Sequence, residues 1–572
     1  MTLQIEHENF SLLSDFIFER YADNAFACHV GKEAITYQEA QQKVHELQAM
    51  LSKVGFSHGD KIALCSENMP NWGIVYLAVI GMGAVVVPIL PEFHSNEIHH
   101  IIKHSGVKAL FASRKLCAKL DEEDFSSRLA YVFELETFEL VEDKTPTHSD
   151  LYIKATSAIQ EMKEQAIQFA KDKKLMPKTS DQNAIKADDL AVIIYTSGTT
   201  GQSKGVMLTH HNLLAQLAQA NILVKIKPQD KFLSILPLAH TFECSIGFLT
   251  PFSNGASIHY INRIPSPKII LKAMQQVKPT YMISVPLIIE KIYKNQVLPE
   301  MNKNKVLSYL YNNIGFARKQ LNKSAGKKLL QSFGGEIKFF GIGGAKLPEY
   351  VEQFLIEARF PYAIGYGLTE TAPLIAGAVV GKTKLGTTGP FVADIEHKFV
   401  KHNETDKEGE LHVRGPNVMQ GYFKEQNQTE AVLDNDGWLN TGDLGYIDDK
   451  GILTISGRSK SVIVGPSGEN IYPEAVESVI DKHPLVCESM VFEKNKKLVA
   501  KIYIDYDKFD EQYQMGTNSD SDMHQELLIL LEEVKKSSNL ALSSYCKLHS
   551  VVEQREPFIK TPTKKIKRYL YQ

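Results

Sequence analysis

The segment from Tyr195 to Val206 constrains this chain most, because glycines, hydroxyl side chains and a lysine crowd into one turn. The apolar run from Leu190 to Tyr195 before it predicts a buried strand. Glycines let a backbone turn tightly and point N–H groups at a ligand, and Lys204 adds a charge suited to phosphate oxygens. The spacing is not that of a Walker A loop. A solvated surface loop is the plain alternative, but the lysine and the preceding strand favour a phosphate-binding loop.

This segment resembles the phosphate loop of the adenylate-forming (AMP-binding) superfamily, which includes acyl-CoA synthetases, luciferases and peptide-synthetase adenylation domains. The resemblance implies that the loop binds the phosphates of ATP. The residues assigned to that site are Thr196, Ser197, Gly198, Thr199, Thr200 and Lys204. The resemblance also gives Thr196 and Lys204 a part in catalysis.

Length and composition narrow the class of protein. A chain of 572 residues predicts roughly two to four domains or subdomains. Six widely separated cysteines without a C-x-x-C pair argue against a disulfide framework or a zinc site and are typical of a reducing compartment. The polar first residues predict no signal peptide, and the net charge of −3 gives no general attraction to nucleic acid. We therefore expect a cytoplasmic protein without a nucleic-acid partner.

Strands and helices alternate in the N-terminal part of the chain. Thr36 and Glu39 form a capping box that opens a helix running to about Val54, with Gly55 at its end. The elements expected next are a strand at 61–65, a helix at 70–82, a strand at 84–87, a helix at 97–104 and a strand at 108–112. This alternation predicts βαβ units and a mostly parallel sheet. We interpret the polar residues 141–187, with one helix expected at 155–171, as an insertion.

Two later motifs concern the acid that is activated. The turn from Leu236 to Glu243 carries His240, and an isolated histidine is more often a structural residue than a ligand-binding one. This turn and the apolar segment Val285 to Tyr293 are similar to motifs of the long-chain fatty acyl-CoA synthetases, in which the histidine lies near the acyl pocket. The resemblance therefore implies a fatty acid substrate close to His240.

Further glycine-rich segments correspond to the nucleotide site. Without the resemblance, 340–348 is a strand-to-helix turn and Asp443 an Asx-turn residue. With it, the assigned residues are Gly343, Gly344, Ala345, Gly365, Tyr366, Gly367, Thr369, Asp443 and Arg458. Tyr366 offers a flat face for stacking and Asp443 a carboxylate for both ribose hydroxyls. Glu370 offers an oxygen ligand for Mg²⁺ and is expected to be catalytic.

The C-terminal part predicts a second, smaller domain. We expect a large N-terminal α/β domain at 1–459, with mixed, mostly parallel sheets and the ATP and acyl sites. A small mobile α+β domain is expected at 460–572, and the resemblance places the hinge between them at Lys460.

The chain ends in a basic run, which is normally a solvated tail. It is also similar to the terminal Thr-x-x-x-Lys-x-x-Arg motif of the superfamily. Aligning Thr561 with the threonine puts Lys565 at the catalytic, nucleotide-contacting position and Arg568 at the arginine. Lys564 is the alternative if the register differs by one residue.

Together these motifs imply a long-chain fatty acyl-CoA synthetase. Such an enzyme uses ATP and Mg²⁺ to convert a fatty carboxylate into an acyl-adenylate and then joins the acyl group to coenzyme A. Three alternatives stay open: an acyl carrier protein as the acceptor, a CoA ligase for medium-chain or aromatic acids, and a non-catalytic acyl- or adenylate-binding protein. The sequence also leaves open whether the chain forms a homodimer.

One basic stretch raises the question of membrane contact. Eight basic residues follow Lys291 before Phe333, against one acidic residue, Glu300. Apolar residues interleave with them at roughly helical spacing: Leu307, Leu310, Tyr311, Ile314 and Phe316. A surface helix with its lysines in water is the plain alternative. A peripheral contact with an anionic membrane is the other interpretation, since a fatty substrate is poorly soluble in water.

Overall fold

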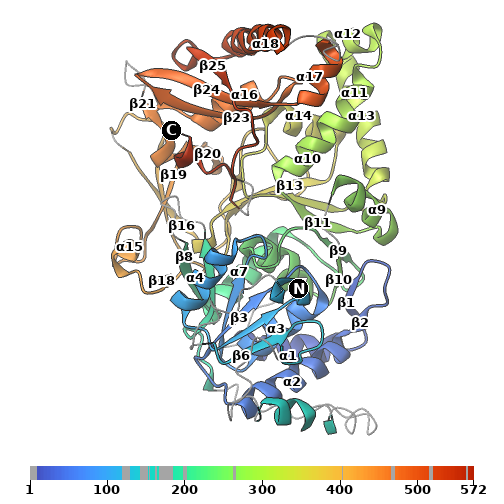
Figure 1. The fold of residues 1–572 in the computed structure, drawn as a ribbon, viewed down its shortest axis with the longest axis vertical. Coiled ribbons are helices and arrows are strands. Elements are labelled where there is room, and N and C mark those ends of the chain that lie inside the picture. The colour runs from blue at the N-terminus through green and yellow to red at the C-terminus, as the bar shows by residue number, and fades with distance from the viewer. Residues whose placement is uncertain are drawn as a thin grey trace.

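The chain folds as an α/β protein of two domains. The computed structural model describes residues 9–118, 129–141, 153, 155–161, 164–165, 184–196, 203–261, 266–401, 403–464, 470–513, 520–561 and 565–571, without the side chains of 520–522. The C-terminal part, in orange and red, lies at one end of the molecule beside the helices of residues 286–358 (Figure 1). The N-terminal sheets and their helices form the other end.

A seven-stranded sheet carries the phosphate-loop segment Tyr195–Val206, with its strands in the order β18-β8-β7-β4-β3-β5-β6. The strands are β3 Lys61–Cys65, β4 Val85–Ile89, β5 Ala109–Ala112, β6 Tyr131–Glu134, β7 Leu190–Thr196, β8 Lys204–Thr209 and β18 Gly421–Tyr422. Strands β7, β4, β3, β5 and β6 run parallel, whereas β8 and β18 are antiparallel to their neighbours. The predicted βαβ units and mostly parallel sheet are therefore confirmed.

The predicted helix after Thr36 is also confirmed. The Thr36 hydroxyl accepts the N–H of Glu39 at 3.1 Å, and the Glu39 carboxylate accepts the N–H of Thr36 at 2.7 Å. Helix α2 (Tyr37–Val54) ends at Gly55, whose φ of +108° is favourable only for glycine. The helices expected at 70–82 and 97–104 are α3 (Pro70–Gly81) and α4 (Ser95–Ser105). Of the helix expected at 155–171, the described residues are helical and the rest lie outside the described part.

An eight-stranded sheet carries the adenine and acyl motifs, in the order β14-β13-β12-β11-β9-β10-β1-β2. Its strands are β1 Ala25–His29, β2 Ile35–Thr36, β9 Lys231–Ser234, β10 Ser257–Tyr260, β11 Tyr281–Ser284, β12 Phe339–Ile342, β13 Tyr362–Gly367 and β14 Leu374–Gly377. All neighbours are parallel except the edge strands β2 and β14. The carboxyl ends of β9, β11, β12 and β13 therefore share one edge, where open α/β sheets bind ligands.

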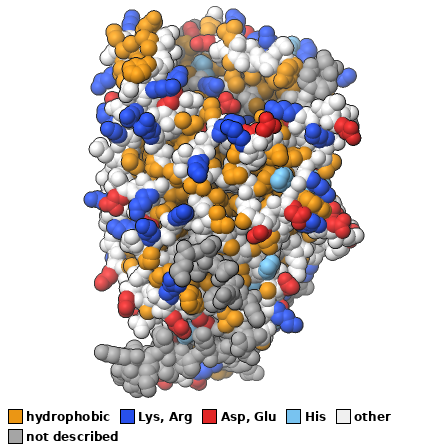
Figure 2. All heavy atoms as spheres, turned by 180° about the vertical axis from the view of Figure 1, so that it is seen from behind, with side chains coloured by type: hydrophobic (Ala, Val, Ile, Leu, Met, Phe, Trp, Pro, Cys, Tyr) orange, Lys and Arg blue, Asp and Glu red, His pale blue; other side chains and the backbone are white. Residues whose placement is uncertain are grey.

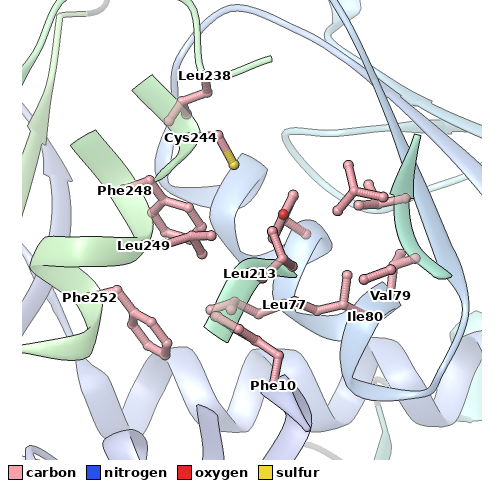
Figure 3. Packing of buried hydrophobic residues seen from close by; sticks show 14 of the residues in the cluster. Phe10, Leu77, Val79, Ile80, Leu213, Leu238, Cys244, Phe248, Leu249 and Phe252 are labelled. Atoms are coloured by element: carbon pink, nitrogen blue, oxygen red, sulfur yellow. The ribbon is translucent and has the colours of Figure 1, made fainter. Parts of the chain in front are cut away.

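Buried helices join the two sheets through one core, of which Figure 3 shows a part. Leu77 and Ile80 of α3 lie near Leu213 of α7 (His210–Leu223), and Phe248 belongs to the π-helical segment η4 (Glu243–Leu249). Leu238 and Cys244 stand on either side of His240 in the sequence, and both are buried in this core. Burial of these two flanking side chains fixes the turn that carries the histidine.

The remaining strands form smaller sheets. A five-stranded antiparallel sheet has the order β15-β20-β19-β17-β16. Its strands are β15 Gly389–Pro390, β16 Glu396–Val400, β17 Gly409–Arg414, β19 Leu439–Ile447 and β20 Ile452–Arg458. The C-terminal part has β21 Ile463–Val464 with β22 Asn470–Ile471, and a sheet of β23 Val486–Lys494, β24 Lys497–Ile504 and β25 Ser550–Glu553. These last strands have a hydrophobic core of their own.

The other helices cover the sheets and connect their strands. They are α1 Phe10–Arg20, α5 Arg114–Cys117, α8 Thr250–Ser253, α9 Pro267–Val277, α10 Pro286–Ile292, α11 Leu298–Met301, α12 Lys305–Asn313, α13 Gly315–Ser332, α14 Glu349–Ala358, α15 Gln426–Glu430, α16 Pro473–Ile480, α17 Tyr506–Tyr513 and α18 Asp520–Ala541. Shorter segments are the π-helical η5 Tyr293–Val297 and the 3₁₀ turns η6 Thr369–Thr371, η7 Ser459–Ser461, η9 Ser544–Cys546 and η10 Arg568–Leu570. Among the described residues, none of the helices has both the length and the apolar character needed to cross a bilayer.

Candidate active site

A cleft of 3180 Å³ lies where the sheets meet the C-terminal domain. The predicted site residues that line it are Thr196, Lys204, His240, Gly343, Gly344, Ala345, Gly365, Tyr366, Gly367, Thr369, Glu370, Asp443, Arg458, Lys460 and Lys565. Ser197, Gly198, Thr199, Thr200 and Lys564 lie outside the described residues. The fold therefore brings every described member of the predicted site into one cavity.

Both ends of the phosphate loop are held by a β-hairpin. Thr196 at the end of β7 pairs with Lys204 at the start of β8. The ammonium of Lys204 lies 4.9 Å from the ring centre of Tyr422, and the Tyr422 hydroxyl donates to Glu370 Oε1 at 2.8 Å. Tyr422 therefore links the loop lysine to the predicted metal ligand through a cation–π contact and a hydrogen bond. Tyr422 carries no sequence motif that predicts this role, because only the pairing of β18 with β8 brings it there.

Glycines keep side chains out of the nucleotide end of the cleft. A Cβ on Gly367 would lie 1.7 Å from the carbonyl oxygen of Pro373, so this position admits no side chain. Gly344 follows β12 with φ of +86°, which also favours glycine. Two backbone segments thus come close to the cavity at the ends of adjacent parallel strands, as the predicted contact with a flat base requires.

Asp443 is held by two donors from different elements. The hydroxyl of Tyr366 on β13 donates to Oδ2 at 2.6 Å, and the guanidinium of Arg458 on β20 contacts Oδ1 at 2.8 Å. Burial raises the pKa of the Asp443 carboxyl, and the positive charge of Arg458 opposes that shift. Oδ2 thus accepts a hydrogen bond and Oδ1 lies in an ion pair, and a carboxylate with these two contacts keeps lone pairs for ligand hydroxyls.

Lys565 is positioned by an ion pair three residues further on. Arg568 Nη2 contacts both carboxylate oxygens of Glu477 on α16, at 2.7 and 2.6 Å. The Lys565 N–H donates to the Thr561 hydroxyl at 3.2 Å, and the Thr561 N–H donates to the Lys565 carbonyl at 2.8 Å. Lys565 is thus tied to Thr561 by two hydrogen bonds and, through Arg568, to α16 of the C-terminal domain, and it lines the cleft together with residues of the large domain.

Charges from both domains act on the Lys565 ammonium, although the residue as a whole is exposed. The crowded cleft lowers the pKa of Lys565 by desolvation, and the positive Arg458 adds to this effect. The carboxylates of Asp443 and Glu370 act in the opposite direction. Lys565 is therefore next to the residues predicted for ribose and metal, in a site prepared for negative charge.

Ion contacts hold the C-terminal domain against the large domain. Lys294 Nζ of η5 donates to the backbone carbonyl of Asp481 at 2.6 Å, and Lys567 Nζ lies 4.0 Å from Glu97 of α4. The Tyr472 hydroxyl also donates to the Glu408 carboxylate of the large domain. None of these contacts could be predicted from the sequence, because their partners are far apart along the chain.

His240 lines the cleft, whereas Glu243 lies fully buried three residues further along the chain, and burial shifts the pKa of both side chains. Burial lowers the pKa of His240 to about 4, with a contribution from the positive Lys565, so the imidazole is neutral at pH 7. Burial raises the pKa of Glu243 to about 8. The fully buried Glu243 accepts the Ser234 hydroxyl at 2.5 Å, and Ser234 in turn accepts the Asn68 amide at 2.9 Å. Burial therefore favours the uncharged form of both side chains.

The donor set suits a magnesium–nucleotide complex. Among the described residues, no group of three or more His, Cys, Asp or Glu side chains could hold a metal ion by itself. Mg²⁺ in nucleotide sites is usually held by one or two carboxylates plus phosphate oxygens and water. Glu370 provides one such carboxylate close to Lys204, so the residues present fit a metal that arrives with ATP.

Fold and site together define an adenylate-forming enzyme, an AMP-forming acid–thiol ligase. The chain belongs to the AMP-binding enzyme family, whose model matches residues 18–423. The predicted superfamily and α/β fold are thereby confirmed.

Named relatives and solved structures are similar over most of their length. Fatty acyl-CoA synthetase A of Dictyostelium discoideum is 26% identical over 573 residues, covering 93% of this chain and 83% of the relative. Peroxisomal long chain acyl-CoA synthetase 6 of Arabidopsis thaliana is 30% identical, covering 83% and 69%. The o-succinylbenzoate CoA synthetase MenE of Bacillus subtilis, solved with its acyl-adenylate, has a TM-score of 0.72 at 21% identity, covering 98% of both chains. That structure supports the fold alone.

The raised pKa of Glu243 predicts a pH-dependent stability. The folded state keeps a proton up to about pH 8 that the unfolded chain releases above about pH 4.5, so this residue lowers stability as the pH rises between those values. In Glu243→Gln this titration is absent. We expect its stability relative to the parent to increase between pH 5 and pH 8, by at most about 1.4 kcal/mol per pH unit.

Urea unfolding at several pH values measures that difference. Glu33→Gln, at an exposed position, is the matched control and should show no such trend. A parallel pH dependence of the parent and Glu243→Gln would mean that Glu243 is already ionised in the folded protein.

Proposed function

We propose that the chain activates a fatty carboxylic acid with ATP and transfers the acyl group to coenzyme A. The observation that carries the proposal is the convergence of Lys565, Glu370 and Asp443 on one cleft, close enough for their charges to interact. The apolar residues Leu287, Ile288, Leu298 and Pro299 line another part of the same cleft. Charged groups suited to a nucleotide and an apolar wall suited to a fatty chain therefore share one cavity.

In the proposed complex, the nucleotide lies across β12 and β13. Gly343, Gly344 and Ala345 would contact adenine through their backbone, and Tyr366 would offer its ring face. Asp443 would accept the ribose hydroxyls while Arg458 and Tyr366 keep the carboxylate in place. Thr369 and the loop residues Thr196 to Thr200 would donate to phosphate oxygens.

The first step joins the carboxylate to AMP. A carboxylate oxygen of the acid attacks the α-phosphorus, and the bond to pyrophosphate breaks with its electron pair going to the pyrophosphate. The acid supplies the nucleophile, so the protein's part is positioning and charge stabilisation. Lys565 would lie between the carboxylate and the α-phosphate, and Lys204 would hold the leaving pyrophosphate. Mg²⁺ bound at Glu370 would neutralise phosphate charge.

The second step forms the thioester. The thiol sulfur of coenzyme A attacks the acyl carbon, AMP leaves with the electron pair of the broken C–O bond, and the thiol proton goes to solvent. We propose a boundary between 1–459 and 460–572, with rotation about Lys460 in η7, the short turn that joins β20 to β21. The structure has Lys565 inside the cleft, the orientation that the first step needs.

A pyrophosphate-release assay over acids of different chain length, with and without coenzyme A, tests the proposal. Release with long-chain acids and thioester formation with coenzyme A are the expected results. Turnover only with medium-chain or aromatic acids would contradict the fatty substrate. Adenylate formed without transfer to coenzyme A would favour an acyl carrier protein as acceptor, and no release with any acid would favour a binding protein. A homodimer stays a prediction.

Replacing Lys565 by alanine should separate the two steps. We expect adenylate formation to fall by about 10²–10³ or more, because one positioned charge-stabilising group typically contributes that factor. Thioester formation from supplied acyl-adenylate should be nearly unchanged. Lys564→Ala is the register control: if it shows this phenotype and Lys565→Ala does not, the catalytic lysine is Lys564.

Replacing Lys460 by proline should trap the first-step orientation. Proline fixes φ near −65°, which is compatible with the 3₁₀ turn Ser459–Ser461 in the present orientation but opposes a switch to another one. Acyl-adenylate should then accumulate without thioester, as measured by chromatography of quenched reactions. Lys460→Ala keeps backbone freedom and should turn over normally. Full turnover by Lys460→Pro would place the hinge elsewhere.

A further inference from the structure

A surface around α12 and the start of α13 combines exposed apolar and basic side chains. The apolar members are exposed by 70% at Val306, 63% at Tyr309, 41% at Ile314 and 75% at Phe316. The basic members, all exposed, are Lys303, Lys305, Lys319 and Lys323. We call these eight residues the basic-apolar surface. Seen from behind, hydrophobic side chains gather at the upper left, over α12, with Lys and Arg side chains beside them (Figure 2).

The lysines of this surface are unneutralised. Residues 301–335 contain seven Lys or Arg and no Asp or Glu. None of the four surface lysines has an ion pair within the described part of the chain. Arg318, which the sequence grouped with them, instead contacts Glu357 of α14 at 2.9 Å. The charge that projects to solvent therefore comes from lysines, while Arg318 fixes α13 to the domain.

The apolar residues of this stretch do not all face solvent beside the lysines, as their spacing in the sequence indicated. The run is two helices that meet at Ile314, and Tyr311 is buried instead of facing solvent. The hydroxyls of Tyr311 and Tyr293 are 3.1 Å apart in a hydrogen bond, and Tyr293 lines the active-site cleft. Val306 and Tyr309, three positions apart on α12, project outward together. One side of α12 thus touches the cleft wall and the other meets solvent.

The cleft reaches this surface. Asn302 borders both the active-site cleft and a shallow hollow of 520 Å³ whose lining includes Lys303, Lys305 and Tyr309. On the cleft side, Leu298 and Pro299 precede Asn302 and give that end an apolar lining. A path from the basic-apolar surface into the acyl side of the cleft therefore needs to pass only this short segment.

We propose that the basic-apolar surface docks on an anionic lipid bilayer and that the fatty acid enters the cleft beside Asn302. The inference rests on the proposed function for its substrate. Unpaired lysines are attracted to acidic headgroups, and Val306, Tyr309 and Phe316 can insert among the upper acyl chains. An anionic bilayer suits both the lysines and the apolar side chains. A second copy of this surface would not, because its own unpaired lysines would face these lysines and repel them. The net charge of −3 means that the attraction is local to this end of the molecule.

Vesicle co-sedimentation tests the docking separately from catalysis. The full-length protein is mixed with vesicles of phosphatidylcholine, with or without phosphatidylglycerol, at low and high salt. We expect binding only to the anionic vesicles at low salt. Lys319→Glu with Lys323→Glu should weaken it at least about 30-fold, because each lysine near such a surface contributes roughly a factor of five. Lys32→Glu with Lys43→Glu, between β1 and β2 and on α2, makes the same charge change on elements away from α12 and α13 and should bind normally (Figure 1).

Two further measurements keep the inference falsifiable. Val306→Ser with Phe316→Ser retains every charge and should also weaken binding, which separates insertion from simple ion attraction. In the activity assay, both surface variants should raise the apparent KM for vesicle-borne acid and leave kcat unchanged for an acid supplied in solution. In contrast, equal vesicle binding by all variants would overturn the inference.

Two other outcomes have a different meaning. Loss of a dimer on size-exclusion chromatography, with vesicle binding intact, would instead identify the surface as a contact between copies. Failure of the proposed function would appear as no turnover of any fatty acid, while vesicle binding would be unaffected.

Discussion

The contact between Arg568 and Glu477 determines where the end of the chain lies. Glu477 lies on α16 with its side chain 11% exposed, and burial alone raises the pKa of this carboxyl. The guanidinium makes burial of that carboxylate tolerable, since removing one partner of a buried ion pair leaves an uncompensated charge. The ion pair with Glu477 fixes Arg568 near the end of the chain, and Lys565, three residues before it, lines the cleft. A charge pair inside one domain thus positions a charge for the other.

The sequence predicted the parts of the fold that depend on local chemistry. The capping box at Thr36 and Glu39, the left-handed Gly55 after α2 and the alternating strands β3, β4 and β5 all follow from neighbouring residues. The nucleotide and lysine motifs likewise identified residues that the fold gathers in one cleft. By themselves these motifs are a glycine-rich turn, an Asx turn and a basic run, and it was their resemblance to the adenylate-forming superfamily that predicted a shared site.

Residues whose role depends on distant contacts were not predictable. Tyr422 has no motif of its own and reaches Lys204 and Glu370 only through strand pairing across the sheet edge. Arg318 was grouped with the surface cations, because nothing near it in the sequence identifies Glu357 of α14 as its ion-pair partner. Periodicity alone also gave one helix where two meet at Ile314, and it could not show which side of α12 faces the protein. Tertiary packing decides these outcomes, and a single sequence does not contain it explicitly.

The π-helical turn η5 determines in which direction the side chains of the following helix α11 project. A π-turn holds one residue more than an α-turn, so the side chains of α11 are rotated by about 100° relative to an unbroken α-helix. With that offset, Leu298 and Pro299 of α11 line the cleft together with Tyr293 of η5. Restoring a regular helix by losing one residue would turn the later side chains out of the cleft. In this stretch the length of the chain is therefore under tighter constraint than the identity of its exposed residues.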